Sequence, residues 1–253
     1  MAFPKPLAAP PPRISLVVPA FDEERLLPQL LASVEIARRS FARGREAVEV
    51  LVADNASTDR TAQIAAAHGC RVARVEKRAI AAARNGGAAA ARGEIVAFTD
   101  ADGRIHPRTF DEIDRAMSDP RLVGGATGLT MERWSLGIGL TFALALPWLW
   151  LWRFDSGVVF CRRHDFDAVG GYDEELRFGE DVAFLLALSR HGKASRRRLT
   201  RLRGVKTVAS ARKFDLHGDW HFFTRMPALG WRFLRGHRDL TQFAERYWYR
   251  RER

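Results

Sequence analysis

Asp100 and Asp102 form an Asp-x-Asp unit at the end of an apolar run, residues 95–99. Two carboxylates at the point where a buried strand emerges suit a hard divalent cation, because Mg²⁺ and Mn²⁺ prefer oxygen ligands. Such ions are commonly shared between one or two carboxylates and the phosphates of a substrate. The unit therefore predicts a phosphate-bearing substrate held through a metal, although acidic pairs also occur in surface turns that bind nothing.

The elements around this unit alternate between β-rich runs and helical patterns. Helical spacing of apolar residues follows each β-rich run, and Ser57 is expected to cap the second helix while Pro107 opens the last. This order predicts an α/β fold with a mostly parallel sheet and helices on both faces. The β-rich runs are residues 14–18, 48–53, 72–75 and 95–99, and the helical patterns are residues 26–34, 57–68, 79–92 and those from 107 onward.

Polar and acidic residues follow three of these strands. Residues 19–23 come after the first strand, Asp54 and Asn55 after the second, and Asp100 and Asp102 after the fourth. In open α/β sheets, ligands bind beyond the carboxyl ends of the strands. The three clusters are therefore predicted to line one edge of the sheet.

Length and composition fit one α/β domain with an appendage. The chain has 253 residues, of which 47% are hydrophobic, so a substantial core is available. Cys70 and Cys161 are too few for a disulfide framework and fit a reducing compartment. Residues 1–12 form a Pro/Ala-rich arm without the apolar centre of a signal peptide. These features favour a cytoplasmic protein.

The basic charge is concentrated at one end of the chain. The net charge is +11, yet residues 190–253 alone hold 18 Lys/Arg against 5 Asp/Glu. Aromatic residues alternate with arginines from Trp220 onward, a pattern that suits the headgroup layer of an anionic membrane. Packing against the catalytic domain is the simpler alternative. Nucleic acid is not expected as a partner, because no RNA- or DNA-binding motif accompanies the charge.

Residues 135–152 contain no charged side chain. Eighteen positions lie at the lower limit for a membrane span. A single crossing, however, would place Asp102 and a later acidic cluster at Asp181 on opposite sides of the bilayer. If both serve one site, the segment is buried, re-entrant or interfacial, and peripheral contact with the inner face of a membrane is one outcome.

Seven short motifs occur in order along the chain. Together they resemble family 2 glycosyltransferases of the GT-A fold over residues 13–210. The resemblance divides the chain into a flexible arm (1–12), a GT-A domain (13–217) and a basic aromatic, helical appendage (218–253). The domain has a nucleotide-binding half (13–106) and an acceptor half (107–217). The motifs are residues 17–24, 52–59, 83–86, 91–94, 99–102, 169–173 and 179–181.

The resemblance implies a nucleoside-diphosphate sugar donor, Mg²⁺ or Mn²⁺ as cofactor, and transfer with inversion at the anomeric carbon. It implies that Asp181 is the catalytic base and that Asp102 and Asp100 bind the metal, with His217 as a further candidate ligand. Two departures are Asp22, where Asn is commoner, and Asn55, where many members have Asp. The residues expected to contact donor or nucleotide are Pro19, Phe21, Glu23, Asp54, Arg78, Arg84, Asp100, Gly157, Glu180 and Arg212.

These residue types match the needs of glycosyl transfer. A divalent cation stabilises the charge that develops on a departing diphosphate. A carboxylate within reach of the acceptor hydroxyl removes its proton. The sequence therefore predicts a glycosyltransferase of the hexosyltransferase class (EC 2.4) with an acceptor hydroxyl of unknown identity, lipid-linked or in the cell envelope. The alternatives are a nucleotidyltransferase acting on sugar phosphates and a non-catalytic module that binds nucleotide sugars.

Overall fold

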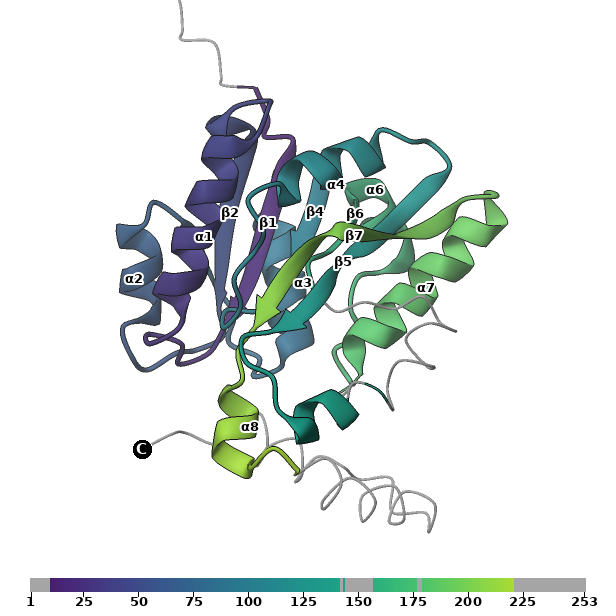
Figure 1. Cartoon of the computed structure of the whole chain (residues 1–253). Helices are drawn as coiled ribbons and strands as arrows, with labels where there is room; N and C mark the ends of the chain where they lie inside the picture. Colours follow the sequence, from purple (N-terminus) through teal and green to yellow (C-terminus); the bar gives the residue numbers. More distant parts are fainter. Residues whose placement is uncertain (1–9, 142, 144–156, 177–178, 221–253) are drawn as a thin grey trace, which may run out of the picture.

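The computed structural model describes residues 10–141, 143, 157–176 and 179–220. Within these residues, a seven-stranded sheet in the order β3-β2-β1-β4-β6-β5-β7 forms the centre of the molecule (Figure 1). The strands are β1 (Ile14–Ala20), β2 (Val48–Asp54), β3 (Arg71–Arg74), β4 (Ile95–Phe98), β5 (Leu122–Met131), β6 (Val159–Arg162) and β7 (Arg198–Ala209).

The first four strands are parallel, as the sequence predicts. Strand β6 runs antiparallel to both β4 and β5, and β7 is parallel to β5. Ala20 pairs with Asp54 at the ends of β1 and β2, and Val17 pairs with Phe98 at the end of β4. The three polar clusters therefore lie at one edge of the sheet, which confirms the predicted arrangement.

Helices cover both faces of the sheet. On one face, α1 (Leu27–Ser40), α2 (Thr61–Ala67) and α4 (Thr109–Met117) pack against side chains that include Leu16, Val50 and Phe160. On the other face lie α3 (Ile80–Ala90), α6 (Arg163–Val169) and α7 (Glu180–Ala194). The remaining labelled elements are the short helices η1 (Arg45–Ala47) and α8 (Arg212–His217). The predicted α/β class is confirmed.

The predicted role of Ser57 as a helix cap is wrong. Helix α2 begins at Thr61, and no side chain caps it at Arg60. Asp59 lies closer to the helix and accepts a hydrogen bond from the Thr61 amide at 2.9 Å. The Ser57 hydroxyl instead accepts a hydrogen bond from the backbone amide of Asp22 at 3.1 Å, so it fastens the loop after β1.

The long apolar segment and the basic tail fall mostly outside the described residues. Residues 136–141 are helical, whereas 142 and 144–152 are not described, and neither are 221–253. Among the residues that are described, no helix has both the length and the apolar character needed to cross a membrane.

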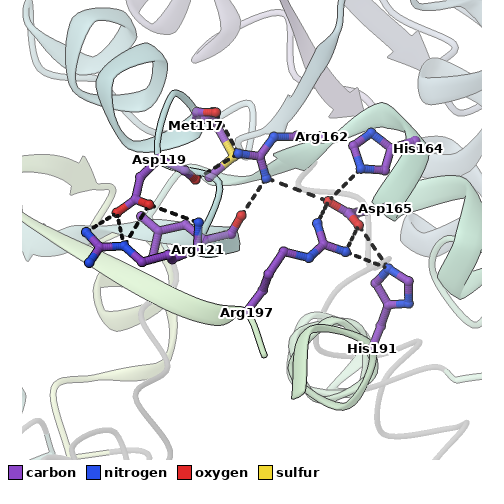
Figure 2. Close-up of polar contacts among 9 residues, drawn as sticks. Met117, Asp119, Arg121, Arg162, His164, Asp165, His191 and Arg197 are labelled. Carbon is purple, nitrogen blue, oxygen red and sulfur yellow. Dashed lines mark hydrogen bonds and ion pairs between the residues drawn. The ribbon is translucent and has the colours of Figure 1, made fainter. Parts of the chain in front are cut away.

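A buried ionic cluster lies where β6, α6, α7 and β7 meet, at the edge of the sheet opposite the polar clusters (Figure 2). Asp165 is fully buried and accepts two hydrogen bonds from Arg197, at 2.7 and 2.8 Å, and contacts His191 Nε2 at 2.9 Å. Arg162 donates to the backbone oxygens of Met117 and Asp119 at 2.7 and 2.9 Å. The cluster therefore links β6 to the end of α4, and α6 to α7 and the residue before β7.

Replacing Asp165 with asparagine is expected to destabilise the fold by about 1–3 kcal/mol, because the partly buried Arg197 side chain, 17% exposed, loses its counter-ion and a charge-assisted hydrogen bond. Burial alone would raise the pKa of Asp165, but hydrogen bonds from Arg197 and His191 outweigh burial and lower it. The stabilisation is therefore present above the unfolded-state pKa, about 3.9, and is lost as pH falls through the folded-state value. Chemical denaturation from pH 7 to pH 3 checks this, with the exposed Asp167→Asn on the same helix as control.

Candidate active site

Arg84 is the centre of the charged network at the carboxyl edge of the sheet. Its side chain is 4% exposed and comes from the middle of α3. Its guanidinium donates to Glu180 Oε1 at 2.8 Å, to Asp100 Oδ1 at 3.0 Å and to Asp181 Oδ2 at 3.1 Å. One cation thus joins the Asp-x-Asp unit after β4 to the acidic pair at the start of α7.

The surroundings of Asp181 tune its carboxylate. Burial, partly offset by Arg84, and the neighbouring charges of Asp100 and Glu180 raise the pKa of Asp181 to about 6. Its Oδ1 atom accepts no hydrogen bond from the described residues, although Arg84 Nη1 lies 3.0 Å away. A carboxylate whose pKa lies near neutrality is chemically suited to receive a proton.

Tyr172 lies beside the Asp181 carboxylate. It was not among the site residues predicted from the sequence. Its ring stacks on Phe184 at 4.3 Å and lies 5.0 Å from the Arg84 guanidinium. Its buried hydroxyl lies close enough to the Asp181 carboxylate to lower the pKa of that group. Burial and the charge of Asp181 raise the pKa of Tyr172, so the phenol stays protonated. The only sequence signal was its place in the motif at residues 169–173.

A second arginine links the loop after β1 to the Asp-x-Asp unit. Arg212, at the start of α8, donates to both carboxylate oxygens of Glu23 at 2.9 and 3.1 Å and lies 3.6 Å from Asp102 Oδ2. Burial raises the pKa of Glu23 to about 7. Arg212 opposes this rise, and the charges of Asp102 and Asp100 add to it. Negative charge is therefore in excess here.

The carboxylates present fit a metal that arrives with its substrate. Among the described residues, no group of three or more His, Cys, Asp or Glu side chains is arranged to hold a metal ion. Asp100 and Asp102 nevertheless offer two carboxylates on one turn, and Mg²⁺ or Mn²⁺ can take its other ligands from phosphates and water. His217 belongs to α8, but its side chain lies outside the described ones, so its proposed ligation stays a prediction.

The nucleoside end of the predicted site lies between β1, β2 and the loop before α3. Pro19 is buried near the end of β1, and the Arg78 guanidinium lies 4.6 Å from the centre of the Phe21 ring. Asp54 is 4% exposed and accepts a hydrogen bond from the Ser57 amide at 3.2 Å. The structure thus gathers these predicted nucleoside contacts around one corner of the sheet.

Asn55 holds this corner together, which explains its departure from the family pattern. Its side-chain amide donates to the backbone oxygens of Val75 at 3.0 Å and Lys77 at 2.7 Å. Its backbone amide donates to Ala20 at 2.8 Å. An aspartate at this buried position would place a carboxylate against two carbonyl oxygens.

Asn55→Asp is therefore expected to lower the free energy of unfolding by at least about 2 kcal/mol at pH 8. The loss should shrink toward pH 5, because a protonated carboxyl can donate one of the two hydrogen bonds. Here the folded-state pKa is raised, so the ionised form is the destabilised one. Urea denaturation at the two pH values checks this. Asn55→Ala serves as control, and its loss should not depend on pH.

Gly157 lies where the backbone packs closely against β5. A Cβ atom at this position would lie 2.2 Å from Thr127 Oγ1 and 2.6 Å from the backbone oxygen of Gly128. The close approach of β5 is therefore sufficient to require glycine. Its predicted contact with the donor remains a prediction.

Comparisons with known proteins agree with the fold and with the family resemblance. Residues 15–139 match the family model of glycosyl transferase family 2. An uncharacterized glycosyltransferase of Mycobacterium tuberculosis is 35% identical over 106 residues, which cover 40% of this chain and 44% of the relative. An undecaprenyl-phosphate 4-deoxy-4-formamido-L-arabinose transferase of Pseudomonas paraeruginosa is 36% identical over 124 residues, which cover 44% of this chain and 34% of that protein. The matched segment thus spans less than half of each relative.

Solved structures extend the likeness to most of the chain. Residues 1–349 of TarS of S. aureus, in complex with UDP-GlcNAc, give a TM-score of 0.61 at 20% identity and cover 78% of this chain and 58% of that chain. The mannosyltransferase PcManGT from Pyrobaculum calidifontis, in complex with GDP-Man and Mn²⁺, gives 0.58 at 21% identity and covers 78% and 56%. The fold is that of GT-A glycosyltransferases. The chain belongs to family 2 of the glycosyltransferases, which confirms the resemblance seen in the motifs.

Proposed function

We propose that this protein is a metal-dependent, inverting glycosyltransferase that moves a sugar from a nucleoside diphosphate to an acceptor hydroxyl. The observation that carries the proposal is the single network in which Arg84 contacts Asp100 on one side and Asp181 on the other. This network brings the metal-binding unit and the base candidate to one edge of the sheet. The family membership and the nucleotide-sugar complexes of similar folds support it.

In this mechanism, Asp100 and Asp102 would hold the cation, which would supply positive charge to stabilise the departing diphosphate. Arg212 lies beside Asp102 and is suited to contact the diphosphate as its charge grows. Asp181 accepts the proton of the acceptor hydroxyl while that oxygen attacks the anomeric carbon. Attack from the face opposite the diphosphate inverts the configuration. Glu180 and Arg84 position Asp181 through their shared hydrogen bonds.

The donor corner has proposed roles of its own. Phe21 and Arg78 offer an aromatic ring and a cation to a nucleobase, and Asp54 offers a carboxylate acceptor. Glu23, which accepts hydrogen bonds from Arg212, would become available to the ribose of the donor when Arg212 contacts the diphosphate. The proposed acceptor is a lipid-linked or cell-envelope hydroxyl, because one of the relatives is an undecaprenyl-phosphate sugar transferase.

A screen of thermal unfolding with UDP, GDP, CDP and TDP sugars, each with and without Mn²⁺, tests the donor half of the proposal. A rise in melting temperature with one base, and only together with the metal, is the expected result. A rise that is independent of metal contradicts the metal role. NMR of the product with a positive donor then reads the anomeric configuration, and retention would contradict direct attack. Donor binding with no turnover on any acceptor would favour the non-catalytic module.

A further inference from the structure

The described part of the chain gathers exposed apolar side chains at one place. Of its eight exposed large hydrophobic residues, five lie on two neighbouring segments, residues 134–140 and 216–220. We call this surface the apolar face. Leu136 is 86% exposed, more than any other member. The members are Trp134, Leu136, Leu140, Leu216 and Trp220.

The two segments form one unit with an inner and an outer side. On the inner side, Ile138 and Phe214 pack in a small core of their own. Arg133 bridges the segments through Asp215 and Asp219, with nitrogen–oxygen distances of 2.5 and 2.7 Å. Because the unit already has a buried core and ionic links, the exposed leucines are not needed to hold its segments together.

The apolar face lies beside the candidate active site. Helix α8 carries Arg212 at its start, against Glu23 and Asp102, and Leu216 one turn later. Six helical residues span about 9 Å, so the face lies within about that distance of the site along this helix. In Figure 1, α8 and the short helix at residues 136–141 project together below the carboxyl edge of the sheet.

We propose that the apolar face inserts into the headgroup region of an anionic phospholipid bilayer and presents the active site to an acceptor anchored there. Leucines flanked by tryptophans match the chemistry of that layer, where apolar side chains enter the acyl boundary and indole rings stay at headgroup depth. The sequence that continues from residue 141 stays uncharged through Trp152. The 18 Lys/Arg against 5 Asp/Glu in residues 190–253 complement anionic lipid.

The identity of the acceptor as a lipid-linked hydroxyl rests on the proposed function, whereas binding of the bilayer does not. The experiment therefore measures binding first, without donor or acceptor. The full-length chain is sedimented with vesicles of phosphatidylcholine and phosphatidylglycerol. The double variant Leu136→Glu/Leu216→Glu is expected to lower the partition coefficient at least about tenfold, because carboxylates resist entry into the acyl boundary. Ile36→Glu on α1, where the side chain is as exposed as Leu216 (55% against 56%), is the control for an added carboxylate and should change it less than twofold.

Three outcomes would overturn the proposal. Unchanged sedimentation of the double variant would show that the face does not meet lipid. A lower melting temperature with unchanged sedimentation would show that another segment of the chain covers the face. A dimer seen by light scattering, and dissociated by the double variant, would assign the face to a second copy. Donor-induced thermal shifts should be the same in wild type and variant, so a failure of the proposed function is recognised separately.

Discussion

Replacing Asp181 with asparagine is expected to lower kcat by about 10²–10⁴-fold while donor binding stays close to that of the wild type, because only proton removal is lost. Asparagine keeps the size of the side chain and can still contact Arg84 through its amide oxygen. The measurements are turnover with saturating donor and the donor-induced thermal shift. Asp167→Asn, an exposed position on α6, is the control and should leave both unchanged.

The raised pKa of Asp181 also predicts how the turnover of the wild type depends on pH. Asp181 must be ionised to accept a proton, and its pKa is raised to about 6 by burial and nearby carboxylates. Turnover should therefore increase with pH up to about 6 and level off above it. A cation bound at Asp100 would move this limb to lower pH, because positive charge favours the ionised carboxylate. The limb should be absent from the residual activity of Asp181→Asn.

Full turnover by Asp181→Asn would contradict the role of base. A nucleotidyltransferase shares the metal and the nucleotide but does not need this carboxylate, so retained turnover would favour that alternative. Loss of both turnover and donor binding would instead indicate that Asp181 holds the site together. The two measurements made in parallel distinguish these results.

The arrangement at the sheet edge could be predicted from sequence because it depends on topology. Parallel strands end at the same edge, so Asp54 and Asp100 had to lie near one another once the alternation of strands and helices was recognised. The antiparallel direction of β6 could not be predicted from its own residues. The direction of β6 depends on how the chain returns to the sheet after β5, which the residues of the strand itself do not specify.

The partners of the arginines could not be predicted in the same way. Arg84 lies 16 positions from Asp100 and 97 positions from Asp181, and no local pattern links them. Sequence reasoning placed Arg84 among the donor contacts because it belongs to a motif of the family. The structure gives its guanidinium three carboxylate partners inside the protein. For Asn55, the sequence showed a departure from the family pattern but not its cause. The cause is visible only in the structure, where the side-chain amide donates to the backbone oxygens of Val75 and Lys77.

Arg84→Met is the second change with a large expected effect, because it leaves Asp100, Glu180 and Asp181 without their common cation. Carboxylates close together resist simultaneous ionisation, so the pKa of Asp181 should increase further. The acidic limb of the pH–rate profile should then shift to higher pH, and kcat at pH 7 should fall. A rise of one pKa unit from about 6 roughly halves the ionised fraction at pH 7, and a rise of two units lowers it about tenfold. Turnover measured from pH 5 to pH 9 checks this.

Arg84→Lys separates positioning from charge. One ammonium retains the positive charge but lacks the planar fork that lets a guanidinium bind several carboxylates at once. The lysine variant should keep the pH limb near its wild-type position and still lose turnover, because Asp100 and Asp181 are no longer held by one rigid group. Arg39→Met, whose side chain is 75% exposed on α1, is the control for loss of an arginine. An unshifted pH profile in Arg84→Met would show that Arg84 does not change the pKa of Asp181. If both variants also lost donor binding while the pH limb stayed in place, the result would indicate that Arg84 contacts the donor.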